Sequence, residues 1–514
     1  MKYLAVVGVA AACGSSPPPP SSQPYVEPVQ LRATPQGEPS EPAPVEVRVV
    51  AVDALPVVRF VRNTLVRAEP DSGAPDIGTI ARNARTAVIG EAPAGAGCAT
   101  RWLQLSPRGW ACDTATVSTD LLPSVAVPAS LTDDDPTPPV TGVYGIVRKQ
   151  ASAFDSIAAI TAGESQALVG NNSVRAVGAV RIDGRRYWRT SGGQLIDEAS
   201  IVGMSPSRFR GVGIDDPEHM PAWVRSAERP ISARAQPSRR AKIARKLKPR
   251  TVVNILSVSD DGRFMEIDLP PHSLSGSAVH PGAAGVIDLP PHSLNGSAVH
   301  PGAAGVIDLP PHSHVWVDRS DLRIAERRAA PEGIGDDDKW FDVDLDAQVL
   351  VAYQGTRPVY ATLVSTGRWG HATPEIITRV AHKLQRTTMA SDQVATSGSN
   401  GEGSTTEVYS VADVPWTMFY DRDYALHAAY WHDGFGSPRS HGCVNLAPYD
   451  ARLLFRWSSP DVPPGWIAVR GDVDHPGSLV RIRSRRVPEP IVRGYARQVR
   501  GYAREVRQRS TTDG

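Results

Sequence analysis

Short apolar runs broken by turn residues limit the folds that this chain can adopt. Between residues 55 and 120 such runs recur every 8–12 residues and are separated by Gly, Pro, Asp or Asn. Runs of this length suit strands, whereas a helix needs a longer stretch with apolar residues at every third or fourth position. The spacing is typical of a small barrel or sandwich. We therefore expect a mostly β protein, and one of several domains because the chain has 514 residues.

The N-terminal 52 residues have the composition of a signal followed by a linker. Residues 1–12 contain Lys2 and an apolar run that ends in three alanines before Cys13. This arrangement resembles a bacterial lipoprotein signal, which is cleaved before a Cys that is then acylated, and an ordinary cleaved signal is the alternative. Residues 13–52 are rich in Pro and Ser and cannot bury enough apolar surface to fold. We expect a disordered tether that begins at a lipidated Cys13.

The other three cysteines fall into two groups. Cys98 and Cys112 lie close together in the first β-rich region, which favours a disulfide in an oxidising compartment. Cys443 then has no partner. An unpaired thiol in an exported protein suggests a chemical role, and a thiol becomes a strong nucleophile when a neighbouring imidazole accepts its proton.

Cys443 lies in a segment with several other reactive or permissive residues. The segment reads Ser440-His441-Gly442-Cys443-Val444-Asn445, and His427 and His432 precede it. Gly442 places no side chain beside the sulfur, so consecutive backbone N–H groups can face an oxyanion, as acyl transfer requires. Two alternatives stay open: a small buried thiol without chemistry, and a zinc site made of His427, His432, His441 and Cys443, although no C-x-x-C or H-E-x-x-H spacing supports it.

The order His, then Ser-His-Gly-Cys-x-Asn, resembles the active-site signature of the L,D-transpeptidase (YkuD-type) catalytic domain. That resemblance implies a peptidoglycan acyltransferase in which Cys443 is the nucleophile and His427 is the general base, oriented by a backbone carbonyl such as that of Ala428. It implies an oxyanion hole in the region of His441 and Gly442. It implies no cofactor and no metal, and substrate contacts for a further group of residues: Ser440, Asn445, Tyr420 and His432.

We expect this catalytic domain at residues 336–471, followed by a basic C-terminal tail at 472–514. Alternating apolar residues predict strands at 340–346, 348–353 and 358–367. A helix expected from Asn445 to Trp457 would place Cys443 just before its N-terminus, where the helix dipole stabilises a thiolate. Residues 391–407 are rich in Ser, Gly and Thr and suggest an inserted loop over the site.

Three β modules are expected before the catalytic domain. Residues 55–122 resemble a bacterial SH3-type (SH3b) domain through Val-Arg-Ala-Glu-Pro, Ile-Gly-Thr-Ile, Trp-Leu-Gln-Leu and Gly-Trp. That resemblance implies binding to the wall polymer, and a spacer without a ligand is the alternative. Residues 140–205 and 222–325 echo parts of the pattern and are expected to be a second and a third module.

The third module contains a nearly identical repeat with a period of 20 residues. Ile-Asp-Leu-Pro-Pro-His-Ser begins at Ile267, Ile287 and Ile307. Repeated histidines can bind metal. The two near-identical 20-residue units between these three motifs are too few to form a solenoid, and recent duplication of a loop explains them more simply.

These features predict a mostly β, multidomain envelope enzyme, with small SH3-like barrels before a β-rich catalytic domain that has a few short helices. Its expected reaction is 3→3 cross-linking of peptidoglycan stem peptides, from a donor tetrapeptide to an acceptor amine, through a Cys443 thioester. Hydrolysis of the same thioester (an L,D-carboxypeptidase or cross-link hydrolase) and a degenerate wall-binding scaffold are the alternatives. A net charge of +1 argues against a nucleic-acid partner. Because Gly14 and Ser15 follow Cys13 without an acidic residue, the expected location is the periplasmic face of the outer membrane.

Overall fold

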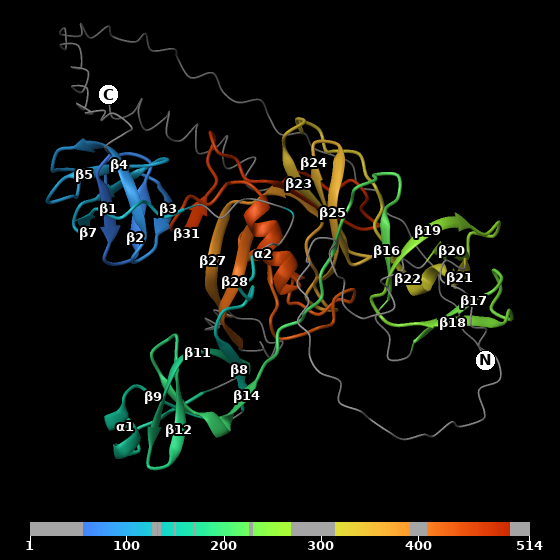
Figure 1. The fold of residues 1–514 in the computed structure, drawn as a ribbon, viewed down its shortest axis with the longest axis horizontal. Coiled ribbons are helices and arrows are strands. Elements are labelled where there is room, and N and C mark those ends of the chain that lie inside the picture. Colours follow the sequence, from blue (N-terminus) through green and yellow to red (C-terminus); the bar gives the residue numbers. More distant parts are fainter. Residues whose placement is uncertain are drawn as a thin grey trace, which may run out of the picture. The chain divides into compact units, whose positions relative to one another are not determined.

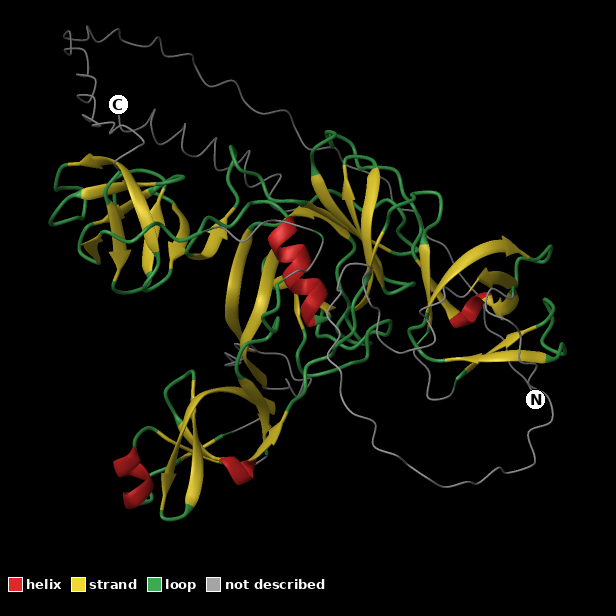
Figure 2. Ribbon diagram, in the orientation of Figure 1, coloured by secondary structure: helices red, strands yellow, loops and turns green. Residues whose placement is uncertain are grey.

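The computed structural model describes residues 55–125, 131, 135–148, 151–168, 171–225, 230–268, 314–390 and 409–493. Strands dominate these residues, so the expectation of a mostly β chain is confirmed (Figures 1 and 2). The predicted lipidation site Cys13, the linker, most of the 20-residue repeats and the end of the basic tail lie outside the described residues. Among the residues described, neither α-helix is long and apolar enough to cross a membrane.

The first module is a small antiparallel β structure whose core also includes Trp466 and Val469 of the C-terminal region. β1 pairs with both β4 and β7, and β5 pairs with β4 and β6. Phe60, Val66 and Leu105 are buried in its centre. The strands are β1 (Val57–Phe60), β2 (Thr64–Arg67), β3 (Asp76–Ile80), β4 (Arg85–Ala92), β5 (Trp102–Leu105), β6 (Trp110–Cys112) and β7 (Thr116–Thr119).

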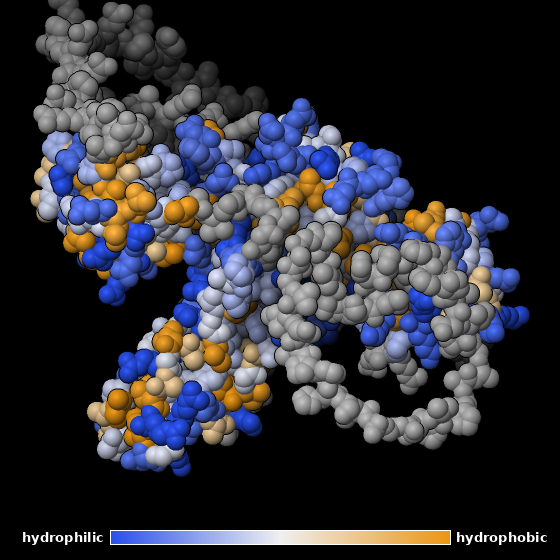
Figure 3. Space-filling model, in the orientation of Figure 1, coloured by the Kyte–Doolittle hydropathy of each residue, from blue (hydrophilic) through white to orange (hydrophobic). Residues whose placement is uncertain are grey.

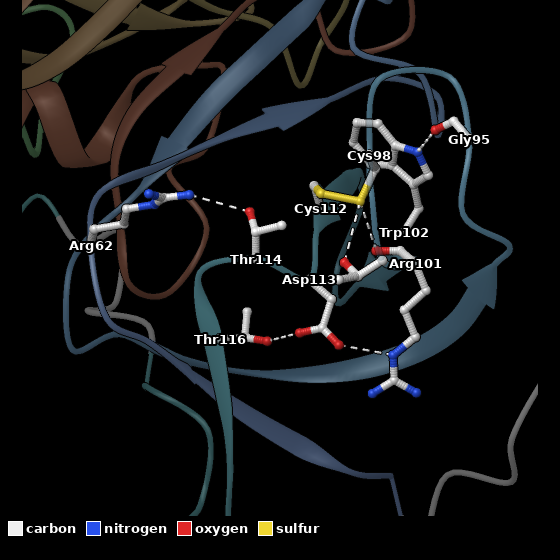
Figure 4. Close-up of a disulfide and its surroundings, with 10 residues drawn as sticks. Arg62, Gly95, Cys98, Arg101, Trp102, Cys112, Asp113, Thr114 and Thr116 are labelled. Atoms are coloured by element: carbon white, nitrogen blue, oxygen red, sulfur yellow. Dashed lines mark hydrogen bonds and ion pairs between the residues drawn. A yellow bond between two sulfur atoms is a disulfide. The ribbon is translucent and has the colours of Figure 1, made fainter.

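A disulfide joins the loop between β4 and β5 to the end of β6 (Figure 4). Cys98 and Cys112 are bonded, with a sequence separation of 14. Trp102 and Trp110 pack in the same small cluster as the bridge. Trp102 Nε1 donates to the carbonyl oxygen of Gly95 at 3.0 Å, which satisfies its polar atom inside the cluster.

The second module surrounds a core that includes Ala153, Trp188 and Ile196. Its α-helix, α1 (Ile157–Ala162), begins after Ser156, whose side chain accepts a hydrogen bond from Ala159 N–H. A short 3₁₀ helix covers Glu198–Ser200. The strands are β8 (Val143–Val147), β9 (Ser152–Phe154), β10 (Gln166–Ala167), β11 (Asn171–Ile182), β12 (Arg185–Thr190), β13 (Leu195–Asp197) and β14 (Ile201–Gly203).

The third module is a seven-stranded sheet in the order β18-β17-β21-β20-β19-β16-β22. Its core includes Ala233, Val253 and Val317. The strands are β16 (Pro221–Val224), β17 (Ile231–Arg234), β18 (Ile243–Leu247), β19 (Val252–Val258), β20 (Phe264–Asp268), β21 (Val315–Asp318) and β22 (Leu322–Ile324).

The remaining strands form the region that was expected to be catalytic. β23, β24 and β25 follow one another as an antiparallel meander, and β27 and β28 form a long antiparallel pair. The short strand β15 (Val212–Gly213) pairs with β25. The strands are β23 (Lys339–Asp344), β24 (Val349–Gln354), β25 (Arg357–Ser365), β26 (Ile376–Arg379), β27 (His382–Ala390), β28 (Tyr409–Asp421), β29 (Tyr424–Ala428), β30 (Val444–Leu446), β31 (Trp466–Arg470) and β32 (Leu479–Arg483).

Two expectations about this region are wrong. The region expected to be catalytic does not end at 471, because β32 pairs in parallel with β23 and buries Val480 and Ile482 in the same core. The helix expected from Asn445 is α2 (Pro448–Trp457), and it starts three residues later. Val444 and Leu446 form a strand instead, because β29 and β25 offer ladder partners and both side chains are fully buried.

Buried charged side chains hold the two ends of α2. Near its start, Asp450 accepts hydrogen bonds from Gly211 N–H at 2.9 Å and from Tyr360 Oη–H at 2.8 Å. Near its end, Lys383 Nζ donates to the carbonyl oxygens of Ser458 and Pro460 at 2.7 and 2.9 Å. Burial raises the pKa of Asp450 to about 6 and lowers that of Lys383 to about 7.

We expect the disulfide to stabilise the first module. In the chain-entropy model a bridge that closes a loop of about 15 residues contributes about 3 kcal/mol. The double variant Cys98→Ser/Cys112→Ser should therefore lower the melting temperature of one transition in a calorimetric scan of the full chain. Dithiothreitol should lower the same transition in the wild-type protein and have no effect on the double variant. A reductant-insensitive wild type would contradict the prediction.

Candidate active site

Strand pairing brings the motif cysteine next to the upstream histidine. β29 and β30 are parallel neighbours, with His427 opposite Asn445 and Leu426 opposite Val444. Residues opposite each other in a ladder, and residues two positions apart in a strand, share one face of the sheet. His427, Asn445 and Cys443 therefore belong to the same face, although 15 residues separate His427 from Cys443 in sequence.

A cavity of about 240 Å³ opens at this face. His427 and Cys443 both line it, together with residues from β27, β28 and the second module. Its wall is formed by Ile146, Asn172, Ser173, Met204, Met389, Val411, His427, Trp431, Arg439, Ser440, His441, Cys443 and Asn445.

His427 is buried and held as a neutral imidazole. Its Nδ1 lies 3.2 Å from the carbonyl oxygen of Ala428, which can only accept, so Nδ1 carries the proton and Nε2 keeps a lone pair. Burial lowers the pKa of His427 to about 4, and the Ala428 carbonyl opposes this with a smaller rise. The ring also stacks on Trp431, with 5.7 Å between centroids. At neutral pH this side chain can accept a proton.

Cys443 is a partly exposed free thiol that is also neutral at rest. Burial raises its pKa to about 11, against a smaller lowering by the Ala425 N–H. Its Sγ–H donates to the carbonyl oxygen of Asp423 at 3.7 Å. The helix dipole does not stabilise a thiolate here as the sequence led us to expect, because β30 separates Cys443 from the start of α2.

Ser440 fixes the turn before Cys443. Its Oγ donates to the carbonyl oxygen of Cys443 at 2.5 Å and accepts from Gly442 N–H at 3.0 Å. Gly442 has a φ of 121°, and a Cβ there would lie 2.5 Å from the ring of Tyr424. The Gly442 N–H is thus occupied, while the structure gives the Cys443 N–H no acceptor among the described residues.

The loop after β25 supports the same turn from the other side. Thr373 Oγ1 donates to the carbonyl oxygen of Gly442 at 2.8 Å and accepts from Gly367 N–H at 2.8 Å. His441 is exposed and lies 2.9 Å, Nε2 to Nη2, from Arg368, and its ring contacts that of His371. Thr373 follows the expected strand at 358–367 by only a few residues, but the tertiary structure alone reveals its contact with the turn.

The partly buried His432 and the buried Asn445 form a pair beside the cavity. His432 Nδ1 accepts from Gly434 N–H at 3.2 Å, so Nε2 carries the proton, and Nε2 lies 3.0 Å from Asn445 Nδ2. Two donors cannot bond, so the Asn445 amide must be turned with Oδ1 toward the ring. The turn would also give Oδ1 a partner, since it otherwise has none in the described region. His432 therefore uses both ring nitrogens in structural contacts.

Tyr420 lies in the core and does not line the cavity. Burial raises its pKa well above the usual value, and the negative charge of a Cys443 thiolate raises it further. Its hydroxyl has no hydrogen-bond partner among the described residues. Within the same residues, no group of three or more His, Cys, Asp or Glu is arranged to hold a metal ion.

The sequence missed the contribution of the second module to this site. Ile146, Asn172, Ser173 and Met204 line the cavity although more than 200 residues separate them from Cys443. No local pattern marks them, because their role depends on how β11 pairs with β28.

Residues 338–482 match the family model described as the L,D-transpeptidase catalytic domain, YkuD. No match was found among curated proteins. The chain is similar to a solved Cys-to-Ser mutant of the Enterococcus faecium L,D-transpeptidase, at 20% identity over 28% of this chain and 50% of that one, with a TM-score of 0.21. It thus spans half the length of that structure.

Two further solved structures are similar over a comparable share of the chain. One is the L,D-transpeptidase (Yku) of Stackebrandtia nassauensis, at 20% identity over 31% of this chain and 58% of that one, with a TM-score of 0.20. The other is an L,D-transpeptidase of Mycobacterium smegmatis, at 17% identity over 34% of this chain and 76% of that one, with a TM-score of 0.21.

The raised thiol pKa predicts slow alkylation at neutral pH. Because the pKa of Cys443 is about 11, its reaction with iodoacetamide should accelerate about tenfold per pH unit between pH 7 and 10. Peptide mapping by mass spectrometry follows the Cys443 peptide separately from Cys13. The same peptide in urea is the control and should level off near pH 9. A folded protein that levels off below pH 9 would contradict the assignment.

Proposed function

We propose that this protein is a peptidoglycan L,D-transpeptidase in which Cys443 carries the acyl group and His427 moves the proton. The match of residues 338–482 to the L,D-transpeptidase catalytic domain supports this class of reaction. The observation that supports the proposal most is the shared cavity: a free thiol and a neutral imidazole with an unprotonated Nε2 line one wall. A thiol beside a base of this kind is the arrangement that nucleophilic acyl transfer needs.

The first half-reaction forms a thioester. Cys443 Sγ attacks the carbonyl carbon that joins the L-centre of a donor tetrapeptide stem to its terminal D-residue, and His427 Nε2 takes the thiol proton. The carbonyl π electrons move to oxygen. The C–N bond then breaks, His427 returns the proton to the leaving amine, and the D-amino acid departs.

Since the pKa values of the thiol and imidazole favour their neutral forms, the proton moves only as the S–C bond forms. An ion pair at rest would leave Cys443 open to side reactions, whereas a neutral pair is activated by the bound substrate.

The oxyanion needs donors that are not already engaged. Gly442 N–H donates to Ser440, so we assign the Cys443 N–H as the first donor. Ser440 then serves to hold the turn, and His441 lies at its exposed side beside Arg368. His432 and Asn445 brace the wall near the base rather than exchange protons.

The second half-reaction releases the acyl group to an acceptor. An amine of a second stem attacks the thioester carbon, His427 Nε2 accepts the amine proton, and the C–S bond breaks as Cys443 regains a proton. The product is a 3→3 cross-link. Water in place of the amine would give hydrolysis, and the choice is an outcome of the experiment below.

We further propose that the N-terminal segments hold the enzyme in the envelope. Lipidation at Cys13 would anchor it to the membrane, and residues 13–52 would tether it there. In that arrangement the SH3b-like first module would contact the wall polymer.

Mass spectrometry of the products tests the reaction. Purified disaccharide-tetrapeptide incubated with the protein should yield a cross-linked dimer and one released D-amino acid per dimer. Cys443→Ala should give neither product, and it should lose the covalent adduct that a carbapenem forms with the wild type. Cys98→Ala keeps Cys443 and should retain the adduct. Tripeptide without dimer would favour hydrolysis, and an adduct of full size on Cys443→Ala would refute the nucleophile.

Separate histidine variants test the base. General base catalysis typically contributes 10²–10⁴-fold, so His427→Gln should lower kcat by about that factor. His432→Gln should lose far less, because its amide can replace the contact with Asn445. High pH should partly rescue His427→Gln, since hydroxide then forms the thiolate. A larger loss at His432, or no rescue at His427, would reverse the assignment.

A further inference from the structure

The second module supplies a wall of the cavity that holds the thiol. Ile146 comes from β8, Ser173 from β11, and Met204 directly follows β14. Ile146 is 44% exposed although it is a large aliphatic residue. Figure 3 shows that the surface of this module carries apolar patches.

This wall is fixed to the catalytic region by specific contacts. β11 pairs in parallel with β28 through Asn171 opposite Tyr409 and Asn172 opposite Ser410. Arg175 Nε donates to Asp413 Oδ2 at 2.7 Å, and both side chains are about four-fifths buried. An ion pair with this burial is better shielded from solvent than a surface pair.

Ser173 connects the wall to the segment that follows the base histidine. Its Oγ lies 2.7 Å from Tyr430 Oη and accepts from Ala412 N–H at 3.0 Å. Tyr430 is fully buried and its ring contacts Tyr144 of the module, with 4.1 Å between centroids. Trp431, the next residue, stacks on His427. The module is therefore attached to the same segment that positions the base.

The wall is mainly aliphatic beside the reacting groups. Ile146 and Met204 from the module join Met389 and Val411 from β27 and β28. Contact between this surface and the methyl or methylene groups of a ligand lowers the free energy of the complex. The aliphatic side chains offer no hydrogen-bond partner to a charged group. The cavity of about 240 Å³ is smaller than the roughly 300–1,000 Å³ of common ligand pockets. It fits a short, slender segment of a polymer.

We propose that the second module is the specificity element of the active site: Ile146 and Met204 form an aliphatic wall that admits extended acyl donors with small or aliphatic side chains and excludes bulky ones from Cys443. The identity of the donor as a stem peptide rests on the proposed function. The steric statement concerns the cavity alone and holds for any electrophile that reaches the thiol.

The rate at which Cys443 reacts with a small and a bulky reagent tests this wall. The full-length protein is treated at pH 9 with iodoacetamide or with N-(1-pyrenyl)maleimide, and the Cys443 peptide is followed by mass spectrometry. Ile146→Ala and Met204→Ala should each raise the maleimide rate about tenfold, a size effect of the kind that one or two methylenes have in an apolar pocket. The iodoacetamide rate should stay within about twofold, since that reagent already fits. Ile146→Trp should slow the maleimide.

Val177→Ala is the matched control, because Val177 is also an exposed aliphatic residue of this module and does not line the cavity. Arg175→Ala, which removes the ion pair with Asp413, should raise the maleimide rate by loosening the whole wall. Limited proteolysis of each variant checks that the module stays folded. Because Ile146 is exposed, its replacement should have little effect on the stability of the module. If the ratio of the two rates is unchanged in Ile146→Ala, Met204→Ala and Arg175→Ala, the proposal is wrong.

The same variants separate this proposal from the proposed function. A shift in the ratio with no cross-linked product from the wild type would retain the wall and reject the transpeptidase. If the wild type forms the cross-link and the variants leave the ratio of the two rates unchanged, the transpeptidase is retained and the wall is rejected.

Discussion

The parallel pairing of β29 with β30 is the contact on which the candidate site depends. It places His427 opposite Asn445 and brings Cys443 to the same face. Parallel strands cannot be joined by a tight turn, so the segment between them is long and carries Trp431 and Ser440, which line the cavity. The core behind the pair is fully buried at Leu426 and Val444. A shift of one residue in this register would turn Cys443 or His427 away from the other.

The turn that presents the thiol is built from backbone contacts as much as from reactive side chains. Ser440 bonds to both Gly442 and Cys443, and Thr373 holds the carbonyl oxygen of Gly442 from a loop about 70 residues away in sequence. Gly442 is required there because a Cβ would collide with Tyr424. These contacts hold the backbone of the turn in one arrangement, including the direction of the Cys443 N–H, as the proposed oxyanion hole would require.

The electrostatics of the site follow from its burial. An imidazole with a pKa of about 4 and a thiol with a pKa of about 11 are both neutral over the physiological range. Under the proposed function, reactivity would then depend on the bound acyl group and on the wall beside Cys443. The second module belongs to this argument because Arg175 pairs with Asp413 of β28, and because Ser173 contacts Tyr430, which lies three residues after His427.

The sequence by itself determined the mostly β class, the pair Cys98 and Cys112, and the stretch from Ser440 to Asn445. Each of these depends on residues that lie close together in the chain. The strands between 340 and 367 also follow from alternation of apolar residues. Only the tertiary structure decided that Val444 to Leu446 is a strand rather than the start of a helix, since buried ladder partners outweigh local propensity there. It also placed β32 beside β23 and β26, and Ile146 and Met204 at the cavity. Contacts between residues hundreds of positions apart leave no periodic trace in the chain, so the wall that faces the thiol could not be predicted from the sequence.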